Sequence, residues 1–192
     1  MDVKSLLVVV VFAACAPAAC APAARAPSVP SVALTGDSGP IDARALVEGA
    51  PYTVITFFSA HCPTQAAHDA RLVALYERYA ARGVRFVAVD SERDASLARD
   101  DAERTRRGYP FSIVIDADAS LARALGAENA TYSVVADARG RVLYAGGIDS
   151  DRTHLTATAT PYLADALDDL LAGRAPRVAE GKSLGCALQT KR

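Results

Sequence analysis

The stretch that decides the fold is YTVITFFSAHCPTQ, residues 52–65. Its first seven residues are all β-branched or aromatic, which is typical of a strand buried on both faces of a sheet. A helix follows at once, because Pro63 suits a first helical turn and apolar residues then recur at helical spacing as far as Gly83. The stretch therefore places Cys62 where a buried strand ends and a long helix begins.

The elements that follow alternate between strands and helices before the pattern changes. A second strand over residues 84–90 makes a strand-helix-strand unit, which implies a right-handed parallel crossover. The sequence DARG then joins two short strands with hairpin chemistry, so these strands are expected to be antiparallel. The remaining predicted elements are a polar helix over 95–107, a strand over 111–115, a helix over 120–125, the hairpin strands 132–136 and 141–145, and a last helix opened by Pro161. This order predicts an α/β fold of three layers, with a mixed central sheet flanked by helices and a central helix-strand-helix insertion.

Length and charge narrow the possible function classes. A chain of 192 residues fits one domain of ordinary size once a leader and a linker are set aside. The 21 basic and 22 acidic residues are interspersed and give a net charge of -1. Nucleic-acid binding depends on clustered basic residues, so nucleic acid is not an expected partner.

The N-terminus has the features of an export signal. Residues 1–15 contain Lys4, a short apolar run, and the sequence FAAC that ends at Cys15. This sequence resembles the lipobox of bacterial lipoproteins, in which the cysteine is acylated, whereas Cys20 is a poorer match. We therefore expect an exported, periplasm-facing lipoprotein anchored to the membrane through Cys15. A cleaved soluble form and a retained N-terminal anchor are the alternatives.

The rest of the chain divides into three predicted segments. Residues 16–35 are rich in alanine and proline and are expected to form an extended tether. Residues 36–175 form the folded domain, and residues 176–192 form a polar tail that carries Cys186. An exported protein meets an oxidising compartment, so a disulfide between the remaining cysteines is possible.

The residues around Cys62 resemble the active-site turn of the thioredoxin superfamily. The similarity is greatest to the redoxin branch, of the alkyl hydroperoxide reductase and thiol-specific antioxidant type, and within it to a bacterial lipoprotein group. The matching pieces are Cys62-Pro63, Gly83-Val84, Asp137 to Arg141, Gly147-Ile148-Asp149 and Gly185-Cys186. The resemblance implies a thioredoxin-like fold and a thiol oxidoreductase with antioxidant or weak peroxidase activity. Cys62 would be its redox nucleophile, because a helix N-terminus stabilises a thiolate.

Two departures from thioredoxin-type reductases limit the chemistry at this turn. Gln65 stands three residues after Cys62, where such reductases carry a second cysteine, so local dithiol exchange is excluded. The family's cis-proline loop corresponds to residues 129–132, which contain no proline and have Thr131 in the loop. Thr131 is therefore only a candidate substrate-binding residue.

The comparison with peroxidases of the family is also partial. Ser59 occupies the position of a residue that orients the peroxide, and Cys62 is followed by Pro63 and Thr64 as in those enzymes. Ile55 replaces their loop proline, and Asn129 replaces the arginine that polarises the peroxide. Loss of one such donor costs about 2 to 4 kcal/mol of transition-state stabilisation, so peroxidase activity is expected to be slow.

The remaining roles follow from the resemblance and leave alternatives open. His61 would add positive charge beside the thiolate or would simply be exposed. Cys186 would either resolve the oxidised Cys62 or serve in docking of the tail. No cofactor is expected, and the expected partners are an external thiol or disulfide reductant, a peroxide, and a membrane reached through the lipid anchor.

Two rival functions come from other classes. The first is a metal-binding module for copper that would use Cys62, His154 and Cys186 as ligands. The second is a redox-inactive scaffold with the same fold. Elsewhere in the chain, His68 is expected at the surface, and Asp149 is expected to orient a loop or to cap a backbone group.

Overall fold

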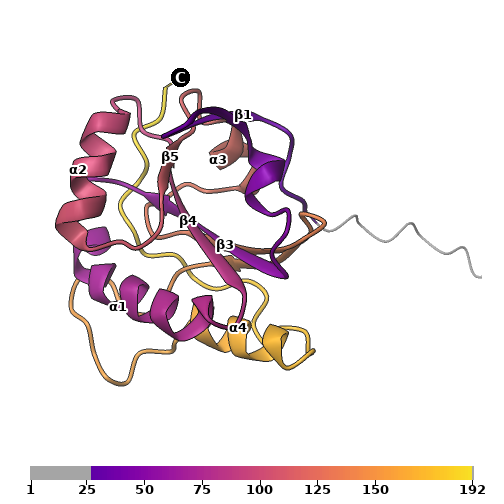
Figure 1. Cartoon of the computed structure of the whole chain (residues 1–192). Helices are drawn as coiled ribbons and strands as arrows, with labels where there is room; N and C mark the ends of the chain where they lie inside the picture. Colours follow the sequence, from indigo (N-terminus) through magenta and orange to yellow (C-terminus); the bar gives the residue numbers. More distant parts are fainter. Residues whose placement is uncertain (1–26, 192) are drawn as a thin grey trace, which may run out of the picture.

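The computed structural model describes residues 27–191, which fold around a mixed sheet of seven strands (Figure 1). The strands are β1 (Ala33–Gly36), β2 (Gly39–Asp42), β3 (Tyr52–Phe58), β4 (Val84–Asp90), β5 (Ile113–Ile115), β6 (Ser133–Asp137) and β7 (Val142–Gly146). They lie in the order β2-β1-β5-β4-β3-β6-β7. Strands β3, β4 and β5 run parallel, whereas β1 and β6 each pair antiparallel with both of their neighbours.

Helices cover both faces of the sheet. They are the 3-10 helix η1 (Ala43–Leu46), α1 (Pro63–Ala80), α2 (Leu97–Arg107), α3 (Ser120–Leu125) and α4 (Tyr162–Leu171). One face packs against α1, α2 and α4, and the other packs against α3 and η1 (Figure 1). The sheet is therefore the middle of three layers.

Strand β3 is buried on both faces, as its composition predicts. Val54 and Phe58 belong to the apolar cluster under α1 and α4, whereas Ile55 and Phe57 belong to the opposite cluster. The strand lies between β4 and β6, near the middle of the sheet. Its C-terminal end, where Cys62 follows, is thus held by the core on two sides.

The predicted three-layer α/β fold with a mixed sheet and a central insertion is confirmed. The β3-α1-β4 unit is parallel, and the insertion between β4 and β6 is α2-β5-α3. The hairpin of β6 and β7 is antiparallel, with a register shift between Val135 and Ala136.

The N-terminal boundary of the domain differs from the prediction. The tether was expected to extend to residue 35, but Val29 and Leu34 are buried in the core and β1 begins at Ala33. Strand β1 pairs with both β2 and β5, so the segment from residue 28 is part of the sheet region. The segment before residue 36 has few apolar side chains and one short strand, so its composition resembles that of a linker.

The C-terminal tail is also packed, although its sequence has no strand or helix periodicity. It runs from α4 across the domain to the opposite end (Figure 1). Isolated bridges join Glu180 to Ala145 and Ala187 to Asn129. None of the helices within residues 27–191 is long and apolar enough to cross a membrane. The predictions for the leader, for Cys15 and for Cys20 lie outside the described residues.

Candidate functional site

Cys62 is the N-cap residue of α1. Its backbone is extended, with φ -86° and ψ 116°, and Pro63 occupies the first helical position. The backbone N–H of Gln65 donates a hydrogen bond to Cys62 Sγ across 3.4 Å. The sulfur therefore accepts a hydrogen bond from one of the free N–H groups at the helix N-terminus, and these groups stabilise a negative charge there.

The structure joins Cys62 to Cys186 in a disulfide. The two Cα atoms are 5.7 Å apart, within the usual range for such a bond. The backbone N–H of Cys186 also donates to Cys62 Sγ across 3.3 Å. Cys62 is only 2% exposed, whereas Cys186 is half-buried, so the tail covers the first sulfur and leaves the second more accessible.

Backbone pairing with the loop before β6 fixes the tail at this point. Ala130 N–H donates to the carbonyl of Cys186 across 2.8 Å, and the Asn129 side-chain amide donates to the carbonyl of Gly185 across 3.1 Å. A further bond joins Leu188 N–H to the carbonyl of Glu128. Asn129, which replaces the family's arginine, is therefore engaged with the tail.

Gly185 is required by the close approach of the tail to this loop. An ideal Cβ at residue 185 would lie 1.6 Å from the carbonyl oxygen of Ala130 and 3.0 Å from Thr131 Oγ1. Thr131 itself is buried and has a positive φ of 69°, which a threonine adopts only under constraint. Its N–H donates to the carbonyl of Phe57 at the end of β3. The loop thus presses against both the tail and the strand that leads to Cys62.

The other predicted residues of the turn lie in different environments. Ser59 is buried, and its Oγ accepts a hydrogen bond from His61 N–H across 3.3 Å, so it shapes the turn. His61 is exposed and its ring lies 3.2 Å from Asp94 Oδ2. Thr64 is buried with no hydrogen-bond partner for its Oγ1 within the described chain, and Pro63 is exposed. The structure gathers all of these residues at the N-terminus of α1.

A buried polar network beneath the turn was not anticipated from the sequence. Gln65 Nε2 donates to the hydroxyl of Tyr109 across 2.7 Å, and this hydroxyl donates to Asp69 across 2.6 Å. Arg107 makes two 3.0 Å bonds to the Asp69 carboxylate and one to the carbonyl of Ala60. Burial, together with the Asp69 carboxylate, raises the pKa of Tyr109 well above its usual value, so the phenol stays protonated. The network ties the residue two before Cys62 to α1 and α2.

The prediction for His68 is wrong, because this residue is buried. Its Nδ1 lies 2.8 Å from the carbonyl of Thr64, and its Nε2 lies 3.1 Å from Asp149 Oδ1. Burial opposes the charged ring, but the hydrogen bonds to Asp149 and Thr64 outweigh it and raise the pKa of His68. Asp149 also pairs with Arg71 and accepts from Asp151 N–H, so it orients its loop as expected.

The copper set expected for the rival function is not assembled in the described part of the chain. The sulfurs of Cys62 and Cys186 are bonded to each other, and His154 is exposed in the loop between β7 and α4. Within residues 27–191, one group of at least three metal-ligating side chains has its ligand atoms within 4.8 Å of one another, and that group contains none of these three residues.

Comparison with known proteins concerns the family and the fold of the chain. The Redoxin family profile matches residues 21–161, which is most of the chain. No protein in the curated collection of characterised sequences matches. A solved structure of an uncharacterized conserved protein from Geobacillus kaustophilus is 28% identical with a TM-score of 0.77, and it covers 88% of this chain and 93% of its own.

Two further structures resemble the chain in fold. A hypothetical protein from Sinorhizobium meliloti is 24% identical with a TM-score of 0.77, covering 88% of this chain and 95% of its own. The peroxidoxin BcpB from Mycobacterium tuberculosis is 15% identical with a TM-score of 0.58, covering 78% of this chain and 96% of its own. At these identities the likeness concerns the fold alone.

Proposed function

The chain belongs to the Redoxin family, and from this membership we propose that it is a two-cysteine thiol oxidoreductase. Cys62 is the nucleophile that attacks the oxidised substrate, and Cys186 is the cysteine that resolves the product. The observation that carries this proposal is the bond between Cys62 Sγ and the sulfur of Cys186, 124 residues away.

The oxidative half of the cycle needs only these two thiols and a hydroperoxide. The Cys62 thiolate attacks the terminal peroxide oxygen, an S–O bond forms, the O–O bond breaks, and the alkoxide or hydroxide leaves after taking up a proton. This gives a sulfenic acid at Cys62. The Cys186 thiolate then attacks the Cys62 sulfur and displaces hydroxide, which leaves as water, so that the disulfide closes.

The reductive half begins at the more accessible sulfur. Because Cys62 is buried and Cys186 is half-buried, an external thiolate attacks Cys186 and displaces Cys62 as a thiolate. The Gln65 N–H stabilises that leaving group. A second external thiol then breaks the mixed disulfide at Cys186, which restores both thiols and releases the oxidised reductant.

Peroxide reduction by this arrangement is slow. The hydrogen bonds to Cys62 Sγ come from two backbone N–H groups, those of Gln65 and Cys186. The buried guanidinium of Arg107 is engaged by Asp69 and by the carbonyl of Ala60. Among residues 27–191 no side-chain cation donates to this sulfur, so the transition state of peroxide reduction lacks one donor that the complete peroxidase site of the family has. The rate of peroxide reduction is therefore about 100- to 1,000-fold lower than at a complete site.

Peroxide consumption with dithiothreitol as the external reductant tests the proposal. Wild type should turn over many times, and Cys62→Ser should consume no peroxide above the uncatalysed rate. When peroxide is added before dithiothreitol, Cys186→Ser should react once per chain and then go on to sulfinic acid, because the folded domain holds no second thiol that closes the sulfenic acid at Cys62. Equal rates for wild type and Cys62→Ser would contradict the assignment of the nucleophile.

We also propose that the protein is exported and anchored to the membrane through an acylated Cys15, on the strength of the leader sequence alone. Substitution of Cys15 by Ser should release the protein from the membrane fraction, because the proposal assigns the anchoring to the acyl chain on this residue. A Cys15→Ser protein that still sediments with membranes would show that another anchor is present.

A further inference from the structure

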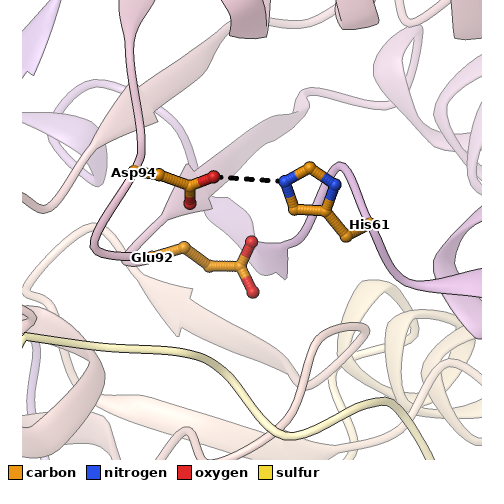
Figure 2. A group of neighbouring side chains, drawn as sticks. All are labelled: His61, Glu92 and Asp94. Carbon is orange, nitrogen blue, oxygen red and sulfur yellow. Dashed lines mark hydrogen bonds and ion pairs between the residues drawn. The ribbon is translucent and has the colours of Figure 1, made fainter.

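Three side chains with metal-binding groups face one another beside the Cys62 turn (Figure 2). His61 comes from the turn between β3 and α1, whereas Glu92 and Asp94 come from the loop between β4 and α2. One ligand atom from each lies within 4.8 Å of the others, and His61 Nε2 is 3.2 Å from Asp94 Oδ2. The group therefore joins two loops at the carboxyl ends of neighbouring parallel strands.

Glu92 is the residue that sets this group apart from an ordinary surface cluster. It is 3% exposed, and its Oε2 is buried with no hydrogen-bond partner among residues 27–191. The Oε1 atom accepts one long bond, 3.5 Å, from Gln189 N–H. A buried carboxylate oxygen that accepts no hydrogen bond is costly to the fold unless a cation compensates it. Figure 2 shows the Glu92 carboxylate turned toward His61 and Asp94.

The charges around the group leave room for a further cation. Arg99 pairs with Asp90, Asp94 and Asp100, so one guanidinium serves three carboxylates. Glu92 has no ion pair with any residue in the range 27–191. Arg99 is thus shared among other carboxylates, and a bound divalent ion would give Glu92 the positive partner that it lacks within these residues.

We propose that His61, Glu92 and Asp94 bind a divalent transition-metal ion of the zinc class. One imidazole nitrogen and two carboxylate oxygens form a donor set that suits Zn²⁺, with water in the remaining position. Zn–N and Zn–O distances are about 2.0 to 2.2 Å, so the ligand atoms draw closer together on binding. The side chains of His61 and Asp94 are 67% and 54% exposed and are free to make this movement. Arg99 keeps its contacts with Asp90 and Asp100 when Asp94 turns to the ion.

The proposed ligands do not include either sulfur of the disulfide. They are an imidazole and carboxylates, and in the oxidised protein both sulfurs of the cysteine pair are already bonded. The oxidised chain is therefore the right sample for a test, because thiolates would otherwise compete for zinc. Cys20, and Cys15 where it is not acylated, are blocked by alkylation.

The experiment is a calorimetric titration of the oxidised, alkylated full chain with Zn²⁺ at about pH 7, in the absence of an affinity tag. Wild type should bind a single ion per chain. His61→Ala, Glu92→Gln and Asp94→Asn should each weaken binding by about tenfold or more. His154→Ala is the matched control, because it removes an exposed histidine from a different loop and should leave the affinity unchanged.

The thermal unfolding of each variant, with and without Zn²⁺, shows that a loss of binding is not a loss of fold. Zinc should raise the unfolding midpoint of wild type and of His154→Ala, and should raise those of the three ligand variants by less at the same zinc concentration. Three results would overturn the proposal: no zinc binding by wild type, equal affinity in His61→Ala and wild type, or an equal loss of affinity in His61→Ala and His154→Ala.

Discussion

Substitution of Gly185 by Ala should disrupt the docking of the tail without touching either cysteine. The new Cβ would meet the carbonyl oxygen of Ala130 at 1.6 Å and its carbonyl carbon at 2.6 Å. Neither atom belongs to a flexible side chain, so the tail itself must move away by at least about 1.4 Å. Such a movement would stretch the 2.8 Å bond from Ala130 N–H to the Cys186 carbonyl beyond hydrogen-bonding distance.

The size of the effect follows from the bonds that hold the tail. The movement would break the Ala130 bond and the bond from the Asn129 amide to residue 185, each of which contributes about 1 kcal/mol. Residual strain at the loop raises the total to about 2 to 3 kcal/mol. Disulfide formation between Cys62 and Cys186 should therefore become about 30- to 150-fold less favourable, which corresponds to a reduction potential about 40 to 65 mV higher.

The assay is a redox titration against glutathione, followed by alkylation of free thiols and measurement of the mass shift. Gly36→Ala is the matched control, because its Cβ would have only ordinary contacts at 3.8 Å and its backbone does not have a positive φ. The control should keep the wild-type potential. A Gly185→Ala protein with the wild-type potential would refute the reasoning, since the tail could not then be docked against Ala130.

Three further predictions concern the pKa of His68, the contribution of Arg107 to stability, and the reactivity of the Cys62 thiol. Because the hydrogen bond to Asp149 raises the pKa of His68, the protonated ring contributes fully to stability below about pH 6.5, and this contribution is lost as the pH rises through the pKa of the folded state. Between about pH 6 and pH 8, the free energy of unfolding in urea should therefore fall more in wild type than in His68→Gln. Arg107→Ala should lower the free energy of unfolding by about 3 to 5 kcal/mol, whereas Arg106→Ala, which breaks an exposed pair, should cost less than about 1 kcal/mol in the same urea assay. In the reduced protein the tail is no longer bonded to Cys62, and iodoacetamide should label Cys62 faster than the tail cysteine because the helix N-terminus stabilises its thiolate. The pH profile of the rate should give an apparent pKa below about 8.5, and a Cys62 that reacts only after unfolding would contradict this.

The turn at Cys62 could be predicted because its signals are local. A β-branched strand, a proline at the first helical position and a helical apolar pattern are adjacent in the sequence, and they produce the N-cap geometry that the structure has. The antiparallel hairpin was predictable for the same reason, since the loop DARG lies directly between its strands.

The residues that escaped prediction depend on partners far away in the sequence. His68 is buried because Asp149, 81 positions later, accepts a hydrogen bond from its ring. Arg107 lies on a helix whose composition is polar, but Asp69 and the carbonyl of Ala60 draw its guanidinium into the interior. The apolar periodicity of α1 and α2 therefore does not indicate that His68 and Arg107 are buried.

The docking of the tail is a third case of this kind. Its strand-like pairing with residues 128–130 is made by backbone groups, which leave no pattern in the side chains. Only the family resemblance marks the pair Gly185-Cys186 in the sequence. The steric need for glycine at residue 185 comes from the carbonyl of Ala130, which lies far away in the sequence.

The most direct test of the central claim is to treat the fully reduced chain with one equivalent of hydrogen peroxide and to map its cysteines after non-reducing digestion. The account predicts the loss of two thiols per peroxide and one cross-linked peptide pair that contains Cys62 and Cys186. Oxidation of Cys62 to sulfenic acid, or to sulfinic acid after a second equivalent of peroxide, while Cys186 remains a free thiol would contradict the claim that these two residues form one redox pair.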